Sequence, residues 1–218
     1  MYNIDTMENL KKLKKEAIEI LESSRGSHDW EHTERVLNMC MHIASVEGGD
    51  TDIIQAAALL HDIGRHAQDI SKGKLSHAEI GVKMARPILE RYQFSPESIK
   101  KILHCIETHR YRKGDEPKSL EARILFDADK LDAIGAIGIG RAFVFAGENG
   151  AAVHIRNLDI ENSKSYTKHD TAYREFKVKL EKVKDRIFTA EGKRLAEERH
   201  DFMVAFFNRL KLEAAGEI

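Results

Sequence analysis

The sequence contains few of the residues that stabilise a protein by covalent cross-links or by rigid turns. Among 218 residues there are two cysteines, Cys40 and Cys105, and three prolines. A disulfide framework and a zinc site made of thiolates both require more cysteines than this. The low proline content also leaves long stretches of chain free to form helices, because proline interrupts the hydrogen bonds of a helix interior.

An excess of charge of one sign and a long apolar run are both missing. The chain has 35 basic and 36 acidic side chains, a net charge of −1. A nucleic-acid polymer is therefore not an expected partner, because such binding depends on an excess of positive charge. No run of about 18 apolar residues occurs, so we expect no membrane segment. Residues 1–17 lack the apolar core of a signal peptide, and we expect a cytoplasmic protein.

Apolar residues recur mostly with the spacing of helices rather than of strands. We therefore predict an all-α fold: a single domain over residues 1–218, with its core at about 25–146 and C-terminal helices at about 170–213. An irregular loop or lid is expected near 147–169, where glycine, asparagine and serine are frequent. The predicted helices are 5–23, 28–46 with Ser27 as N-cap, 51–62 with Thr51, 77–92 with Ser76, 96–109 with Ser95, a buried apolar stretch at 120–146, 170–190 and 191–213.

Histidine is the residue that stands out, with eleven in the chain. Four of them share a predicted helix face with apolar residues: His32, His61, His77 and His109. One such histidine is usually a hydrogen-bonded core residue, because a buried imidazole needs a polar partner. Four of them, on four predicted helices, exceed what ordinary packing requires.

Carboxylates accompany these histidines. Asp62 directly follows His61, and Asp129 and Asp132 lie one turn apart in the apolar stretch. A carboxylate is costly to bury unless it is paired or binds a metal. Imidazole and carboxylate together form a mixed nitrogen and oxygen site that suits Mn, Fe, Co, Ni or Zn. The sequence therefore predicts a site for a divalent metal ion.

Three segments then resemble a known family. Residues 27–36 (SHDWEHTERV), 58–64 (ALLHDIG) and 127–135 (DADKLDAIG) are similar to the H…HD…D signature of the HD superfamily of metal-dependent phosphohydrolases. The likeness to small stand-alone bacterial HD hydrolases covers most of the chain. It implies a helical HD-domain bundle in which a divalent ion (Mn, Co, Ni, Fe, Zn or Mg) is bound by four residues: His32, His61, Asp62 and Asp129.

The resemblance also implies an activity. Members of this subgroup are similar to nucleotide pyrophosphohydrolases, so the expected reaction converts a nucleoside triphosphate to monophosphate and pyrophosphate through a metal-bound hydroxide. A phosphodiesterase, a phosphomonoesterase and a nucleotide-sensing module without turnover remain alternatives. Arg65-His66 stands where alarmone hydrolases carry Glu-Asp, which argues against that substrate. The two-metal HD phosphodiesterases carry a Gly-Tyr-Pro signature after the last of their additional histidines. This signature is absent here, where residues 110–114 read RYRKG.

Further roles are assigned as hypotheses. His77 and His109 either bind a second ion or contact substrate phosphate. Asp62 and Asp132 are the candidate catalytic carboxylates, although a structural role for Asp132 is an equal alternative. The expected partner is a small-molecule phosphate substrate, such as a nucleotide. Its phosphates need cationic side chains, and its base needs an aromatic side chain for stacking. A homodimer is also possible. The candidates for substrate contact are Arg25, Arg65, Lys130, Arg141 and Tyr166.

Overall fold

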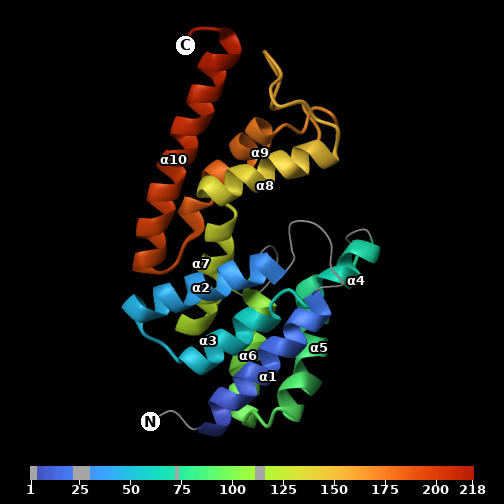
Figure 1. Ribbon diagram of the computed structural model, residues 1–218, viewed down its shortest axis with the longest axis vertical. Helices are drawn as coiled ribbons and strands as arrows, with labels where there is room; N and C mark the ends of the chain where they lie inside the picture. The colour runs from blue at the N-terminus through green and yellow to red at the C-terminus, as the bar shows by residue number, and fades with distance from the viewer. Residues whose placement is uncertain (1–3, 22–29, 72–73, 111–115) are drawn as a thin grey trace. The chain divides into compact units, whose positions relative to one another are not determined.

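The computed structural model describes residues 4–21, 30–71, 74–110 and 116–218, and it contains no strand within these ranges (Figure 1). The predicted all-α fold is confirmed. Among the described residues, no helix has both the length and the apolar character required to cross a membrane. The elements are α1 (Ile4–Leu21), α2 (Trp30–Glu47), α3 (Thr51–Leu60), α4 (Arg65–Ile70), α5 (His77–Arg91), α6 (Pro96–Thr108), α7 (Leu120–Asp132), α8 (Gly135–Glu148), α9 (Ala172–Val178), the 3-10 turns η1 (Leu180–Lys182) and η2 (Lys184–Arg186), and α10 (Ala190–Ala215).

The chain divides into two compact units, residues 1–129 and residues 130–218. The first unit holds α1 to α6 and most of α7, and the second holds the last residues of α7 together with α8, α9 and α10. That residues 1–218 form one domain stays a prediction.

Helix α3 is the centre of the first unit. It packs against α1, α2 and α6, while α5 packs against α4 and α6 (Figure 1). Residues 56–60 of α3 are all buried, and so are Ile53 and Ile54. A helix that is apolar on every side has to be covered by others on every side. This burial places the end of α3, where His61 follows, in the interior of the unit.

The N-cap residues of three helices in the first unit agree only in part with the predicted caps. Asp50 caps α3, since its side chain accepts hydrogen bonds from the backbone amides of Asp52 and Ile53. The predicted cap, Thr51, was wrong: a carboxylate one residue earlier satisfies these amides instead. Ser95 caps α6 ahead of Pro96, as predicted. Ser76 precedes α5, although its side chain makes no capping hydrogen bond.

The apolar stretch of residues 120–146 forms two helices rather than one. Gly135 adopts φ of +77°, and this left-handed residue separates α7 from α8. Gly138 allows a close contact, because a Cβ there would lie 2.3 Å from the carbonyl oxygen of Ala133. Helix α8 extends to Glu148, and turns and bends follow as far as Asp170.

In the second unit α8 packs against α9 and α10, and the core contains several stacked rings. Phe176 and Phe207, for example, stack with ring centroids 4.7 Å apart. The predicted helix 170–190 was wrong. Helix α9 ends at Val178, because the backbone of Lys179 leaves the helical region with φ of −136°. Leu180, Val183 and Ile187 are buried along the following 3-10 turns. Their spacing of three and four residues is the same as that of a helix face, which explains the wrong prediction.

Candidate metal centre

Six side chains from separate parts of the sequence converge inside the first unit. Helices α2, α5 and α7, the turn after α3 and the end of α6 each contribute at least one of them. All are buried except the Asp129 side chain, which is 17% exposed. They are His32, His61, Asp62, His77, His109 and Asp129.

The six side chains form two triads, each able to hold a metal ion. In each triad the three ligand atoms lie within 4.8 Å of one another. The first triad is His32, His61 and Asp129. The second triad is Asp62, His77 and His109. The structure thus brings together every residue that the sequence analysis assigned to a first or second metal.

Asp62 faces both groups of histidines with different oxygens. Its Oδ2 lies 3.8 Å from His32 Nε2 and 3.9 Å from His61 Nε2. Its Oδ1 lies 3.2 Å from His77 Nε2 and 3.7 Å from His109 Nε2. One carboxylate is therefore placed to serve two neighbouring cation positions. The first position also has the Asp129 carboxylate, whose Oδ1 is 3.5 Å from His32 Nε2.

The hydrogen bonds of the imidazole rings define which nitrogen is available to a metal. His61 Nδ1 lies 2.8 Å from the carbonyl oxygen of Ala58, and His109 Nδ1 lies 2.6 Å from that of Ile106. A carbonyl oxygen can only accept, so both Nδ1 atoms carry the hydrogen and donate it. In the neutral ring the opposite nitrogen, Nε2, then has a free lone pair. These Nε2 atoms point to the two triads.

The ring nitrogens also face one another at short range. His61 Nε2 is 3.4 Å from His32 Nε2, and His77 Nε2 is 3.0 Å from His109 Nε2. Burial lowers the pKa of His61 to about 4 and that of His77 to about 2, so both rings are neutral near pH 7. Opposed lone pairs beside a buried carboxylate repel unless a cation lies among them. The donor set therefore fits a divalent ion.

Two glycines allow the helices that carry these ligands to approach closely. A Cβ on Gly64 would lie 2.3 Å from the carbonyl oxygen of His77 and 2.8 Å from the amide of Gly81. A Cβ on Gly81 would be 3.6 Å from the carbonyl oxygen of His61. The turn that holds His61 and Asp62 thus sits directly against α5. Gly64, two residues after Asp62, is needed because only a residue without a side chain lets this turn pack so closely.

Arg65 is part of the cluster through Asp62. Its Nη2 donates to both carboxylate oxygens of Asp62, at 2.9 Å to Oδ1 and 3.1 Å to Oδ2. The sequence analysis expected Arg65 to contact substrate. The structure places its guanidinium on the carboxylate that the two triads share.

The remaining predicted residues that the structure describes belong to the second unit. In the second unit, the buried Asp132 accepts a hydrogen bond from Arg141, and Arg199 donates to the carbonyl oxygen of Leu131. Lys130 is partly buried in α7. Arg25 lies outside the described residues. Tyr166 is 77% exposed, with its ring against Phe145.

Two residues that contact the cluster were not found from the sequence. The side-chain oxygen of Gln68, in α4, lies 2.8 Å from His77 Nδ1 and accepts from Arg110 at 2.9 Å. Gln68 gave no signal, because a neutral polar residue in a short, unpredicted helix resembles any surface residue. Arg110 gave a weak one, since it directly follows His109.

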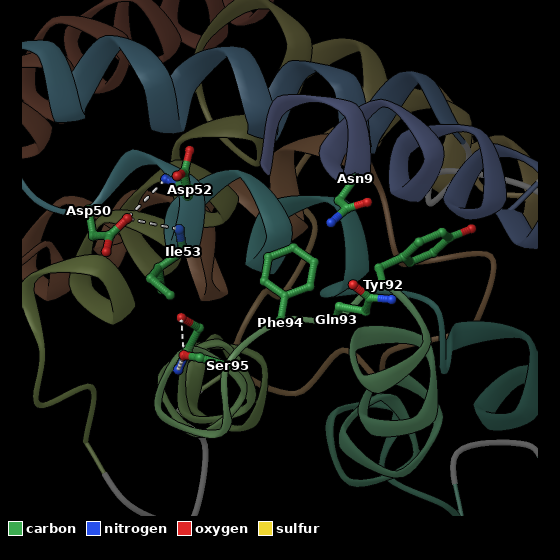
Figure 2. Close-up of a pocket in the computed structure, with 9 residues that line it drawn as sticks. Asn9, Asp50, Asp52, Ile53, Tyr92, Gln93, Phe94 and Ser95 are labelled. Atoms are coloured by element: carbon green, nitrogen blue, oxygen red, sulfur yellow. Dashed lines mark hydrogen bonds between the residues drawn. The ribbon is translucent and has the colours of Figure 1, made fainter. Parts of the chain in front are cut away.

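A separate cavity of about 280 Å³ lies at the other end of α3 (Figure 2). It is lined by residues at the start of α3, by Asn9 of α1 and by the segment from Tyr92 to Ser98. None of the six clustered side chains is among its lining residues. The metal centre and this cavity are therefore distinct features of the first unit.

Comparison with known proteins identifies the family. Residues 29–134 match the model of the HD domain. Over 201 residues the chain is 33% identical to the protein YpgQ of Bacillus subtilis, an alignment that covers 90% of this chain and 89% of YpgQ. The chain therefore belongs to the HD superfamily and is a metal-dependent phosphohydrolase, as the resemblance predicted.

Solved structures agree over almost the whole chain. A hydrolase of the HD superfamily from Bacillus thuringiensis has a TM-score of 0.77 and 31% identity, covering 96% of this chain and 98% of that one. YpgQ, crystallised in complex with ADP, has a TM-score of 0.74 and 28% identity, covering 96% of this chain and 97% of that one. The fold described above is thus that of these two proteins.

A more distant likeness covers half of the chain. Ribonuclease Y of Symbiobacterium thermophilum is 32% identical over 112 residues, 51% of this chain. The aligned part is only 19% of ribonuclease Y. The likeness is therefore to one portion of a much longer protein.

Proposed function

We propose that the protein hydrolyses nucleoside triphosphates to monophosphate and pyrophosphate with the help of divalent metal ions. The position of Asp62 carries this proposal, because its two oxygens face two different histidine pairs. A nucleotide as the substrate is supported by the similar protein YpgQ, which was crystallised in complex with ADP.

The first ion would be held by His32, His61, Asp129 and the Oδ2 oxygen of Asp62. A second ion, or alternatively a substrate phosphate, would be held by His77 and His109 beside the Oδ1 oxygen. Imidazole ligands favour Mn, Fe, Co, Ni or Zn over Mg, which prefers oxygen ligands. A bound divalent ion neutralises charge on phosphoryl oxygens and lowers the pKa of a bound water toward about 7.

The protein's own groups would prepare this chemistry in three ways. The neutral imidazoles supply nitrogen ligands without cancelling the charge of the ion, which keeps it a strong Lewis acid. Asp62 aligns the two positions, and Arg65 orients Asp62 through its three hydrogen bonds. Substrate contacts by Arg25, Arg65 and Lys130, and a catalytic role for Asp132, stay proposals.

The test is to identify the products formed from each nucleoside triphosphate with Mn, Co, Ni, Zn or Mg. Phosphorus NMR is expected to show pyrophosphate and monophosphate as the first products. The variants His61→Ala and Asp62→Ala are expected to lose metal-dependent turnover while circular dichroism shows unchanged helix content. The exposed His42 of α2 provides a control, since His42→Ala should retain full activity.

Other results would change the assignment. Stepwise release of orthophosphate would indicate a phosphomonoesterase. Tight nucleotide binding in calorimetry without any product would indicate a sensing module. Undiminished hydrolysis by both His61→Ala and Asp62→Ala would contradict the proposed site altogether.

Phosphodiester hydrolysis is a second candidate, favoured by a specific observation. The second triad offers three side chains that could hold another ion beside the first. Two ions can stabilise both the attacking and the leaving oxygen of a displacement at phosphorus. The likeness to part of ribonuclease Y supports the same reaction class. Cleavage of a short oligonucleotide or a cyclic nucleotide, faster than that of any triphosphate, would make this candidate the preferred one.

A further inference from the structure

His77 differs from His61 and His109 in how its ring is oriented. His61 and His109 each donate from Nδ1 to a carbonyl oxygen three residues earlier, in Ala58 and Ile106. These acceptors belong to the preceding turn of chain, so the local helical geometry provides them. The two rings are therefore oriented by the segments that carry them.

His77 lacks this possibility because it is the first residue of α5. No helical turn precedes it in α5, so no carbonyl of that helix is available three residues earlier. The acceptor comes from α4 instead: His77 Nδ1 lies 2.8 Å from Gln68 Oε1. The backbone amide of His77 donates to the same oxygen at 3.3 Å. Gln68 thus replaces the missing carbonyl.

Arg110 determines which end of the Gln68 amide faces His77. Its Nη1 donates to Gln68 Oε1 at 2.9 Å. A guanidinium has only donors, and so has a backbone amide, so both require an acceptor at this point. The amide nitrogen of Gln68 would face two donors if the group were turned over. The oxygen is therefore held toward His77, 2.8 Å from its Nδ1. Arg110 Nη1 also lies 3.4 Å from this nitrogen, but the shorter contact with an acceptor oxygen favours Nδ1 as the nitrogen that carries the hydrogen.

This arrangement leaves His77 Nε2 as the nitrogen with the free lone pair. That atom lies 3.2 Å from Asp62 Oδ1 and 3.0 Å from His109 Nε2, within the second triad. The other tautomer would place a hydrogen on Nε2, directly in the space where a ligand lone pair is needed. Hydrogen-bond partners of metal-binding histidines fix the tautomer in this way in many metalloproteins.

We propose that Gln68, held by Arg110, is a positioning residue that sets the tautomer of His77 and thereby the affinity of the second triad for a metal ion. This inference rests on the proposed function, since it concerns the same site. It adds a specific dependence: the second position relies on a contact between α4 and α5, whereas His61 and His109 are oriented locally.

The test compares Gln68→Leu, which removes the acceptor, with Gln68→Glu, which keeps it. Nitrogen NMR of the metal-free protein, labelled in histidine, reports the tautomer of His77. Calorimetry with Mn²⁺ then reports the number and affinity of bound ions per chain. Gln55→Leu, at another partly buried glutamine in α3, is the matched control.

We expect wild type, Gln68→Glu and Gln55→Leu to show His77 with hydrogen on Nδ1 and to bind two ions. Gln68→Leu should shift the ring toward the other tautomer and weaken the second ion by about 10- to 100-fold, with the first ion unchanged. Arg110→Met should produce a smaller change in the same direction.

The inference is overturned if Gln68→Leu leaves both the tautomer and the second affinity unchanged, or if Gln68→Glu behaves like Gln68→Leu. A wild-type protein that binds one ion per chain also overturns it. That last result would leave the proposed hydrolysis at the first triad intact. The proposed hydrolysis is tested separately, by the activity of His61→Ala and Asp62→Ala. The two failures are therefore distinguishable.

Discussion

The guanidinium of Arg65 binds both carboxylate oxygens of Asp62, the residue that the two triads share. A metal ion and Arg65 therefore interact with the same negative charge. The guanidinium is partly buried, with 12% of its side chain exposed, so solvent screens this competition incompletely. Arg65, which the sequence analysis expected to contact substrate, thus contacts a candidate metal ligand.

Removal of Arg65 should therefore strengthen metal binding. We expect Arg65→Leu to bind Mn²⁺ about tenfold more tightly in calorimetry, because one unit of positive charge next to the ligand is lost. Arg91→Leu is the control, since Arg91 pairs with Glu16 on an exposed surface. Unchanged or weaker binding by Arg65→Leu would mean that orientation of Asp62 outweighs the repulsion.

The stability of the metal-free protein should decrease in mild acid. Burial lowers the pKa of His61 from 6.5 to about 4 and that of His77 from 6.5 to about 2. Below pH 6.5 the unfolded chain gains protons that the native rings do not accept. The free energy of unfolding should thus fall by up to about 1.4 kcal/mol per pH unit for each histidine. Below pH 4 only His77 still contributes.

Urea unfolding at pH 7, 6 and 5 in the presence of a chelator measures this dependence. His61→Asn should show a smaller decrease between pH 6.5 and 5 than wild type, whereas His42→Asn should show the wild-type decrease. A free energy of unfolding that is constant over this range would contradict burial of neutral imidazoles in the native state.

The contact between the His61-Asp62 turn and α5 should not tolerate a methyl group. Gly64→Ala is expected to lose about 2–3 kcal/mol of stability, because the new Cβ would collide with backbone atoms of His77 and Gly81. Metal binding should weaken as well, since the collision separates ligands of the two triads.

Gly140→Ala is the matched control. Gly140 lies inside α8 with no heavy atom within 4 Å of the position of a Cβ. Alanine there should add about 1 kcal/mol of stability through its higher helix propensity. Thermal unfolding of both variants measures the difference, and similar melting temperatures would refute the close packing at Gly64.

The segment before α9 should depend on one buried ion pair. Arg174 donates to Asp170 Oδ1 at 2.7 Å and to the Ser163 hydroxyl at 2.6 Å, and both charged groups are buried. Arg174→Met leaves the Asp170 carboxylate buried without its cation, which should cost about 3–5 kcal/mol. Arg194→Met, at an exposed pair with Glu191, should cost less than about 1 kcal/mol. Equal losses in denaturant titrations would contradict this view.

The sequence alone predicted the class of fold and the candidate metal ligands. Helical periodicity arises from neighbours three and four residues apart, so it can be recognised without knowing the tertiary structure. The pair His61-Asp62 and the apolar faces behind His32, His77 and His109 were local in this sense. Periodicity failed at residues 179–187, because buried residues three and four apart occur in 3-10 turns as well as in a helix.

Only the tertiary structure decided how the ligands are shared and oriented. Which oxygen of Asp62 faces which histidine depends on how distant helices pack. The contact from Gln68 to His77 is of the same kind: it exists because α4 and α5 meet where α5 begins. Such contacts have no fixed spacing along the chain, and so no pattern in the sequence could have predicted them.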